Sequence, residues 1–225
     1  KYIEIFNCQH IIEQNNATGC ILTNCINSVM RKCSYQVNNN SGAVCIKSSG
    51  CTQLKMQQCT TENNTDTSST GTGFYLAACT NATLSECKAL GNGNGTGFAL
   101  VTSGTAITLD RCVATNYGIG FQIEAINDIT LERCLAEGNT LYGFYLKDST
   151  GLAQECIAQG SDLSGTAQGV GFFDASAAST KMAYAANIAR DNGTPLETNY
   201  SYIALPDPFI PALYNDGATY WQNVQ

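Results

Sequence analysis

The chain has 225 residues, of which only 13% are charged, and its formal net charge is −7. The negative charge argues against nucleic acid and anionic membrane surfaces as partners. No apolar run approaches the roughly 18 residues of a membrane-spanning helix. The chain has one histidine and no Cys-x-x-Cys pair, which argues against a zinc site. It begins at Lys1 without a methionine or a signal peptide, so we expect a processed form or a fragment.

Cysteines recur along the first three quarters of the chain at intervals of roughly 22 to 28 residues. They are Cys8, Cys33, Cys59, Cys87, Cys112, Cys134 and Cys156. The segments around them are similar, as in "ITLDRCVA" and "ITLERCLA", and a second motif of the form Gly-Phe-x-Leu alternates with them. A period of this length predicts a stack of structural repeats.

Each repeat has the pattern of short strands. Ile107 and Leu109 are two residues apart, which is the period of a strand with one buried face. The polar pair after Leu109 predicts an outside corner, after which Cys112 and Ala114 point inward again. A turn and the Gly-Phe-x-Leu strand complete a coil of about three strands, which must stack on its neighbours to bury its apolar face. The sequence therefore predicts an all-β, single-stranded parallel β-helix of about seven to eight coils over residues 1–190.

With these repeats the chain resembles the right-handed parallel β-helix superfamily. That superfamily includes pectate-lyase-like enzymes, phage tailspikes, and surface proteins of bacteria and giant viruses. The resemblance covers about residues 1–190 and implies a right-handed coil. It implies little about function, because this scaffold supports both enzymes and inert stalks.

The cysteine period predicts a ladder of buried thiols, with Cys59, Cys87, Cys112, Cys134 and Cys156 at its centre. A second ladder is expected eight residues earlier in each coil, from Cys25, Cys51 and Cys79 through Gly104, Ile126 and Asp148. An extracellular location would favour disulfides. Side chains of adjacent parallel strands point the same way, however, which is poor geometry for a bridge. We therefore expect mostly free thiols.

Charged residues stack at the predicted corner. They are Asp110, Arg111, Glu132, Arg133 and Glu155. Polysaccharide-active β-helices use clustered carboxylates as acid, base or calcium ligands. Here arginines accompany the acids, so we expect a neutralised, solvated corner without catalysis, metal or cofactor. His10 is expected to be a residue of the coil edge and neither a ligand nor a base.

The middle residue of each Gly-Phe-x-Leu motif should point outward, because Phe and Leu share the inner face. Across the coils these residues are Ile21, Val44, Tyr75, Ala99, Gln122, Tyr145 and Phe173. An outward apolar and aromatic stripe on a soluble protein is usually covered. The expected covers are the chain's own tail, a sister subunit, or a sugar stacked on the tyrosines.

The repeat ends near residue 190, and all four prolines and the only tryptophan follow it. Residues 191–225 carry too much apolar surface for a disordered tail, so we expect an arm or cap that wraps over a preformed surface. The predicted subunit interface combines the stripe with this arm: Tyr75, Tyr145, Phe173, Tyr200, Tyr202, Pro206, Phe209, Tyr214, Tyr220 and Trp221.

Six Asn-x-Ser/Thr sequons could carry glycans in a glycosylating host: Asn16, Asn63, Asn81, Asn94, Asn192 and Asn199. Together these features favour a structural or interaction protein, a self-associating subunit of an extracellular, cell-surface or virion-surface fibre, spike or filament. The alternative is a carbohydrate-active enzyme or glycan-binding module.

Overall fold

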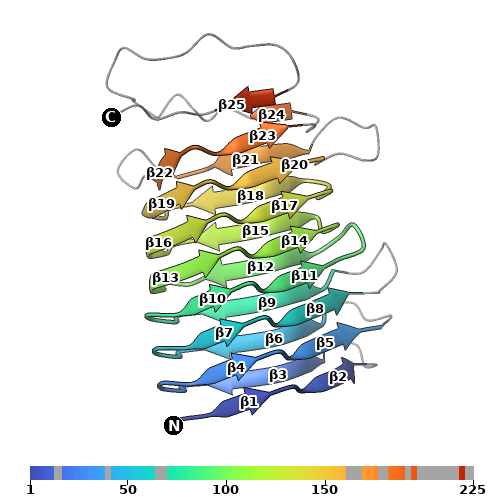
Figure 1. Ribbon diagram of the computed structural model, residues 1–225, viewed down its shortest axis with the longest axis vertical. Coiled ribbons are helices and arrows are strands. Elements are labelled where there is room, and N and C mark those ends of the chain that lie inside the picture. The colour runs from blue at the N-terminus through green and yellow to red at the C-terminus, as the bar shows by residue number, and fades with distance from the viewer. Residues whose placement is uncertain are drawn as a thin grey trace.

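The computed structural model describes residues 1–12, 17–38, 42–63, 70–160, 169–176, 182–190, 194–196 and 218–220. Within these residues every regular element is a β-strand, and the strands form three long sheets, named A, B and C here (Figure 1). Each strand of a coil pairs with its counterparts in the coils before and after it. The predicted parallel β-helix is confirmed. None of the described residues belongs to a helix that could span a membrane.

Sheet A is built from the strands that precede the cysteine ladder. Its strands are β1 (Glu4–Phe6), β4 (Val29–Arg31), β7 (Lys55–Gln57), β10 (Thr83–Ser85), β13 (Thr105–Asp110), β16 (Asn127–Glu132), β19 (Gly151–Gln154) and β22 (Met182–Ala185). Leu84, Leu109 and Leu131 lie in register on its inner face and are fully buried. Thr83, Thr108 and Thr130 occupy the outer face of the same three strands, so these strands are apolar inside and polar outside.

Sheet B follows the cysteines. Its strands are β2 (Gln9–Ile12), β5 (Ser34–Val37), β8 (Thr60–Asn63), β11 (Lys88–Leu90), β14 (Val113–Thr115), β17 (Leu135–Glu137), β20 (Ile157–Gln159), β23 (Ile188–Arg190) and β25 (Ala218–Tyr220). The middle residue of its later strands is a fully buried alanine: Ala89, Ala114, Ala136, Ala158 and Ala189.

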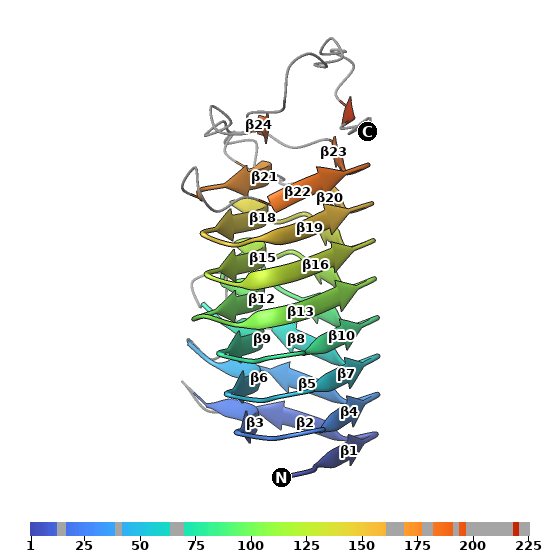
Figure 2. The ribbon, with the colours of Figure 1, turned by 90° about the vertical axis from the view of Figure 1, so that its left-hand side faces the viewer.

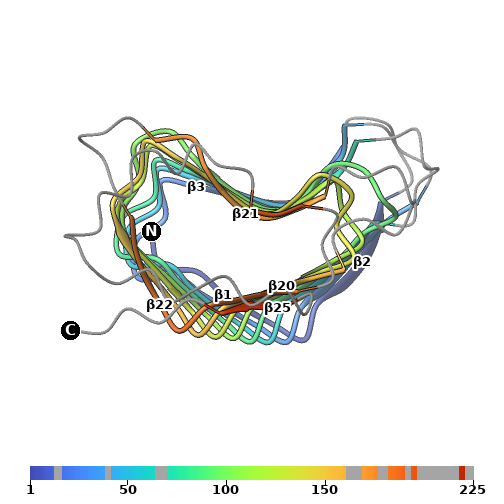
Figure 3. The ribbon, with the colours of Figure 1, turned by 90° about the horizontal axis from the view of Figure 1, so that it is seen from above.

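Sheet C contains the Gly-Phe-x-Leu motifs. Its strands are β3 (Thr18–Thr23), β6 (Val44–Ser49), β9 (Thr72–Ala77), β12 (Thr96–Val101), β15 (Ile119–Glu124), β18 (Tyr142–Lys147), β21 (Val170–Asp174) and β24 (Thr194–Leu196). Viewed along the long axis, sheets A and B meet at an angle on one side, and sheet C closes the other side and bends inward (Figure 3). The side view shows the strands of each sheet stacked directly above one another (Figure 2).

The glycine of the motif exists because sheets B and C approach closely at that point. A Cβ at Gly120 would lie 2.6 Å from the carbonyl oxygen of Gly143 and 3.2 Å from the Cβ of Ala136. One at Gly143 would lie 3.0 Å from the Cβ of Ala158. Glycine in sheet C and alanine in sheet B are therefore the two small halves of one contact, repeated in each coil.

The phenylalanine of the motif forms a continuous stack in the core. The members are Phe74, Phe98, Phe121, Phe144 and Phe172, all at most 2% exposed. Neighbouring ring centroids are 4.7 to 4.9 Å apart, and the ring planes deviate from parallel by 3° to 5°. This spacing follows the strand-to-strand distance of a sheet, so strand pairing itself aligns the rings.

Sheets A and B join at a corner made by one residue in the left-handed conformation. Its φ lies between 52° and 54° in every coil, at Asn7, Lys32, Gln58, Glu86, Arg111, Arg133, Glu155 and Ala186. Each such non-glycine residue costs on the order of 1 kcal/mol. Backbone hydrogen bonds to the next coil offset this strain: the Arg111 N–H donates to the Glu132 carbonyl (2.9 Å) and the Arg133 N–H to the Gln154 carbonyl (3.0 Å). The predicted outside corner is present, and the next residue points inward.

The predicted outward stripe is wrong at Val44. The sequence pattern aligned Gly42 with the recurring glycines, but Ile46 pairs with Phe74 and Lys47 with Tyr75. Ile46 is fully buried and fills the phenylalanine position, whereas Gly42 lies in the preceding turn with φ at 70°. Core filling thus sets the register: Lys47 lies in the outward column of Tyr75, whereas Val44 lies in the neighbouring outward column of Thr72.

The second ladder is wrong at Asp148, which is exposed. Ser149 takes the inner position: it is fully buried, and its Oγ accepts a hydrogen bond from the Ile126 N–H at 3.1 Å. Ile129 pairs with Gly151, so the turn is one residue shorter here than in the previous coil. Gly151 accommodates the deletion with φ at 142°. A constant spacing of eight residues could not reveal this change.

Strand pairing continues past residue 190. β24 lies parallel to β21 at the end of sheet C, and β25 pairs antiparallel with β23 at the end of sheet B. The domain boundary at residues 190 and 191 stays a prediction. The rest of the predicted arm, with Tyr200, Tyr202, Pro206, Phe209, Tyr214 and Trp221, lies outside the described residues.

Candidate functional site

An aromatic cluster lies on the outer face of sheet C, in β18 and β21. Tyr142 and Phe173 have ring centroids 5.1 Å apart at 27°, and Tyr145 and Phe173 are 5.6 Å apart at 31°. Tyr142 and Tyr145 are 5.3 Å apart. All three side chains are half-buried, so each ring keeps part of its surface exposed. Sequence reasoning identified Tyr145 and Phe173 but missed Tyr142.

The cluster forms because two consecutive residues between Tyr142 and Tyr145 are buried. The two residues between them, Gly143 and Phe144, both face the interior: Phe144 belongs to the ring stack, and Gly143 faces Ala158. Outward residues are therefore three apart instead of two, and the rings of Tyr142 and Tyr145 have centroids 5.3 Å apart. Seen along the long axis, the sheet that carries them bends inward (Figure 3). The Gly-Phe pair that the core requires also assembles the outer cluster.

Polar groups adjoin the rings in the coils below. The Gln122 amide donates a hydrogen bond to Glu124 (2.8 Å) and accepts one from the Thr96 hydroxyl (3.3 Å). Gln122 pairs in register with Tyr145. Partial burial, followed by the charge of Glu124, raises the pKa of the Tyr145 phenol. This face thus combines aromatic surface with an amide and a carboxylate.

The rest of the stripe is mixed. Ile21 is 62% exposed, Ala99 is buried, and Tyr75 is half-buried with the Lys47 Nζ 5.6 Å from its ring centroid. Tyr220 belongs to β25, of which only the backbone is described. The structure therefore brings together Tyr145 and Phe173 of the predicted interface, and Tyr75 lies on the same face further along the axis.

A second apolar stripe, which sequence reasoning missed, lies on the outer face of sheet B. Val113, Leu135, Ile157 and Ile188 occupy the same register position in four successive coils. All four side chains are half-buried. The signal was present in the sequence: each of these residues precedes an inward alanine, so alternation directs it outward.

The corner charges form a lattice of ion pairs. Arg133 binds Asp110 (3.0 Å) and Glu132 (2.8 Å), and Arg111 binds Asp110 (3.1 Å) and Glu86 (3.3 Å). The predicted neighbours in space are therefore neighbours, with Glu86 as an added member. Asp110 and Glu132 are thus each paired with a guanidinium group of these arginines. Glu155 is exposed, and no salt-bridge partner for it lies among the described residues.

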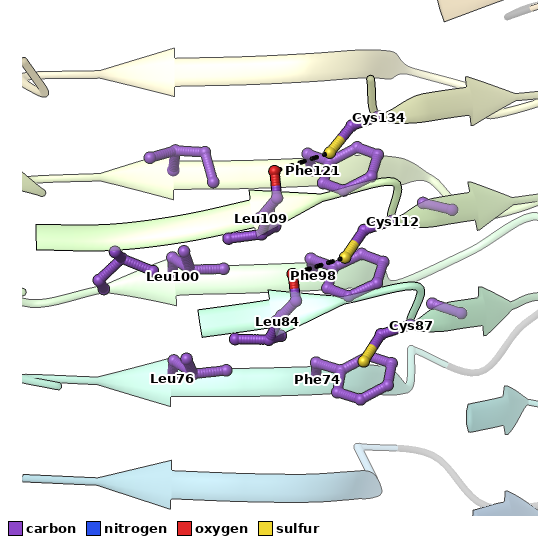
Figure 4. Packing of buried hydrophobic residues seen from close by; sticks show 14 of the residues in the cluster. Phe74, Leu76, Leu84, Cys87, Phe98, Leu100, Leu109, Cys112, Phe121 and Cys134 are labelled. Atoms are coloured by element: carbon purple, nitrogen blue, oxygen red, sulfur yellow. Dashed lines mark hydrogen bonds between the residues drawn. The ribbon is translucent and has the colours of Figure 1, made fainter. Parts of the chain in front are cut away.

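The ladder cysteines line the core beside the phenylalanine stack (Figure 4). The thiol of Cys112 donates to the Leu84 carbonyl (3.5 Å) and that of Cys134 to the Leu109 carbonyl (3.4 Å), each in the preceding coil. Cys59, Cys87 and Cys156 are equally buried, and all these cysteines are free thiols in the structure. Burial raises the pKa of the Cys112 thiol, which favours the unreactive protonated form.

Asn187 continues the cysteine ladder in the last coil. Its side-chain oxygen accepts from the Cys156 N–H (2.8 Å) and its amide donates to the Ala153 carbonyl (2.8 Å). His10 is exposed at the opposite end, with its ring 6.4 Å from that of Tyr35. Across the described part of the chain, no three His, Cys, Asp or Glu side chains are grouped so that they could hold a metal ion.

The sequons differ in exposure. Asn63 is 1% exposed, Asn94 is half-buried, and Asn81 is exposed at a corner. Asn16, Asn192 and Asn199 lie outside the described residues. A glycan on Asn63 is incompatible with this fold, because its side chain is enclosed beside Gly71.

Comparison with known proteins addresses the fold. The family model of the right-handed β-helix region matches residues 3–114 and 59–192. Among solved structures, the chain is similar to QnrB1, a plasmid-mediated fluoroquinolone resistance protein, with 9% identity, 68% of this chain and 76% of that chain covered, and a TM-score of 0.25. That likeness is too low to carry a functional argument. No curated protein matches the chain in sequence. Since the family model spans most of the described coils, the protein belongs to the right-handed β-helix family.

Proposed function

We propose that the protein is a structural or interaction protein: a self-associating subunit of an extracellular, cell-surface or virion-surface fibre, spike or filament. Its contact surface in this proposal is the outer face of sheet C around Tyr142, Tyr145 and Phe173. The protein has no catalytic role in this proposal.

The aromatic cluster carries the proposal. Three half-buried rings occupy one side of a sheet whose interior is already filled by the phenylalanine stack. They are not needed to complete the core, and exposed aromatic rings are enriched in protein interfaces. The corner acids support a non-enzymatic role, because Asp110 and Glu132 are already engaged in ion pairs with Arg111 and Arg133.

The test is the molar mass of the full chain in solution, measured by light scattering over a wide range of concentrations. We expect the mass to rise with concentration, and the double variant Tyr145→Ser/Phe173→Ser to have at most half the wild-type average mass at the highest concentration.

Leu152→Ser is the matched control, because Leu152 is a half-buried outward residue of β19 in sheet A, the strand that follows β18 in the chain. It should leave the mass unchanged. A wild-type chain that remains monomeric at every concentration, or a double variant that assembles like wild type, would contradict the proposal.

A second candidate function is glycan binding at the same surface. The observation that favours it is the amide of Gln122 and the carboxylate of Glu124 beside the rings, since sugars stack on aromatic faces and place their hydroxyls on such groups. Calorimetric titration with neutral and acidic oligosaccharides distinguishes the candidates. Saturable binding that is lost in Tyr145→Ser, by a chain that stays monomeric, would favour the glycan.

A further inference from the structure

The apolar stripe on the outer face of sheet B begins abruptly. In register from β2 to β23, the outward residues are Gln9, Ser34, Thr60, Lys88, Val113, Leu135, Ile157 and Ile188. The first four are polar and the last four are aliphatic. Four coils span three strand steps of about 4.8 Å each, so the aliphatic stripe is roughly 14 Å long. It faces away from sheet C and is separate from the aromatic cluster (Figure 3).

We propose that a second copy of this chain packs on this stripe, sheet B against sheet B, with the two solenoid axes antiparallel. The two copies are related by a two-fold axis that runs along the strand direction. This arrangement sets Val113 of one copy opposite Ile188 of the other, and Leu135 opposite Ile157.

The periodicity of the stripe favours a second copy as the occupant. Its aliphatic side chains recur at the strand spacing of the sheet, and an identical stripe matches that spacing at every step. A two-fold axis makes the contact self-complementary, which is the commonest interface of homo-oligomers. Every matched pair joins two aliphatic side chains, so apolar surface meets apolar surface along the whole stripe.

The charges at the corner beside the stripe agree with the same register. Arg133 and Glu155 are the corner residues two positions before Leu135 and Ile157, and both are exposed. When Leu135 of one copy faces Ile157 of the other, Arg133 faces Glu155, and the two-fold axis repeats this pair. Glu155 has no salt-bridge partner of its own among the described residues, so the contact supplies one. Opposite charges in register specify partner and orientation.

The consequence for assembly rests on the proposed function. A subunit with one self-complementary contact on sheet B and another on sheet C, on opposite sides of the coil, adds neighbours on both sides and forms an open-ended array. Either contact alone stops at a dimer.

The experiment measures molar mass by light scattering and sedimentation, in a background that removes the sheet C contact, Tyr145→Ser/Phe173→Ser. We expect this background to form a dimer. Adding Leu135→Lys and Ile157→Lys should raise the dimer dissociation constant at least tenfold, whereas adding Thr130→Lys on the outer face of sheet A should leave it unchanged. Circular dichroism melts check that each variant retains the fold.

The outcomes separate the two proposals. A background that is monomeric while wild type assembles overturns the sheet B contact and leaves the sheet C proposal intact. A lysine pair without effect on the dimer also overturns it. The third outcome is that Tyr145→Ser/Phe173→Ser has the same molar mass as wild type, whereas Leu135→Lys/Ile157→Lys has a lower one. In that case the proposed role of sheet C fails and the sheet B contact stands.

A charge exchange tests the register. Arg133→Glu and Glu155→Arg are made in separate chains of the same background. Each alone should dimerise at least tenfold more weakly, because like charges face each other twice. An equimolar mixture should recover dimers, since both facing pairs are then opposite in charge. A mixture that dimerises no better than either variant alone overturns the antiparallel register.

Discussion

The first four coils and the last four coils have the same inner residues where they meet but differ outside. Leu84 and Leu109 meet across the divide, as do Ala89 and Ala114, with no change in side chain. On the outer face of sheet B the same step changes Lys88 to Val113. On the outer face of sheet C the step from β12 to β15 changes Thr96 to Ile119.

This difference between inner and outer positions indicates which residues are required for the fold. Inner residues that persist across the divide while the outer ones change mean that stacking depends on the inner positions. The outer positions are free to vary, so a coherent apolar outer surface confined to four coils is not a requirement of stacking. It identifies the half of the molecule where partners are expected to bind.

The largest expected effect tests whether the interior is as uniform as this comparison requires. A Cβ at Gly73 would lie 2.7 Å from the Gly97 carbonyl oxygen, and one at Gly120 would lie 2.6 Å from that of Gly143. Gly73→Ala and Gly120→Ala should each lower the free energy of unfolding by about 3 kcal/mol, because backbone cannot move away cheaply. Urea denaturation measures both. If only one of the two variants loses stability, the glycine position does not serve the same purpose in the two halves of the molecule.

Alkaline pH should lower the stability that two buried thiols of the first four coils provide, Cys45 and Cys79, which lie outside the main cysteine ladder. Burial raises the pKa of Cys45 from 9.0 to about 12 and that of Cys79 from 9.0 to about 11. The folded state thus binds these protons more tightly than the unfolded state. Their contribution to stability is complete below pH 9 and is lost as the pH rises toward 11 and 12. Mass spectrometry after iodoacetamide treatment should find both thiols unmodified at pH 8 and alkylated as the fold is lost above pH 9.

Truncation of a ladder thiol should have a smaller effect that is equal in the two halves. Cys59→Ala and Cys134→Ala each remove one sulfur atom from a fully packed site, with an expected loss of about 1 kcal/mol. Thiol titration of the unfolded chain without reductant should find most of the twelve cysteines free. Six disulfides would contradict the ladder of free thiols.

The smallest effect is expected at the corner. Glu132→Gln removes one partially exposed partner of Arg133 and should change stability by less than about 0.5 kcal/mol. Incubation of wild type with pectic, alginate and other uronate polymers should give no turnover. Turnover that Glu132→Gln abolishes would place the protein among the enzymes of its family.

The fold was predictable because the interior repeats in residue type as well as in spacing. The cysteines, the alanine two residues later and the Gly-Phe pair each mark a fixed position around the coil. Prediction failed where one marker was replaced or shifted. Ile46 replaces phenylalanine, which led to the choice of Val44, and a one-residue deletion moves the inner position from Asp148 to Ser149.

The candidate surfaces were less predictable, because they depend on which outward residues of one strand lie beside those of the neighbouring strands. Tyr142 and Tyr145 meet only because Gly143 and Phe144 both face inward, which strict alternation does not allow. The stripe containing Leu135 follows from alternation alone once Ala136 is placed inside. It was missed because its aliphatic residues also look like ordinary core residues.

The shortened turn at Ser149 and Gly151 has a consequence for the size of the molecule. The coils above and below it remain in register although the turn lost a residue, so each coil is aligned by its immediate neighbours alone. A chain built this way can gain or lose a whole repeat without redesign of the rest. Each added repeat lengthens the rod by about 4.8 Å. The number of repeats therefore sets the distance between the two ends of the rod. Duplication of a single segment of the gene would change that distance.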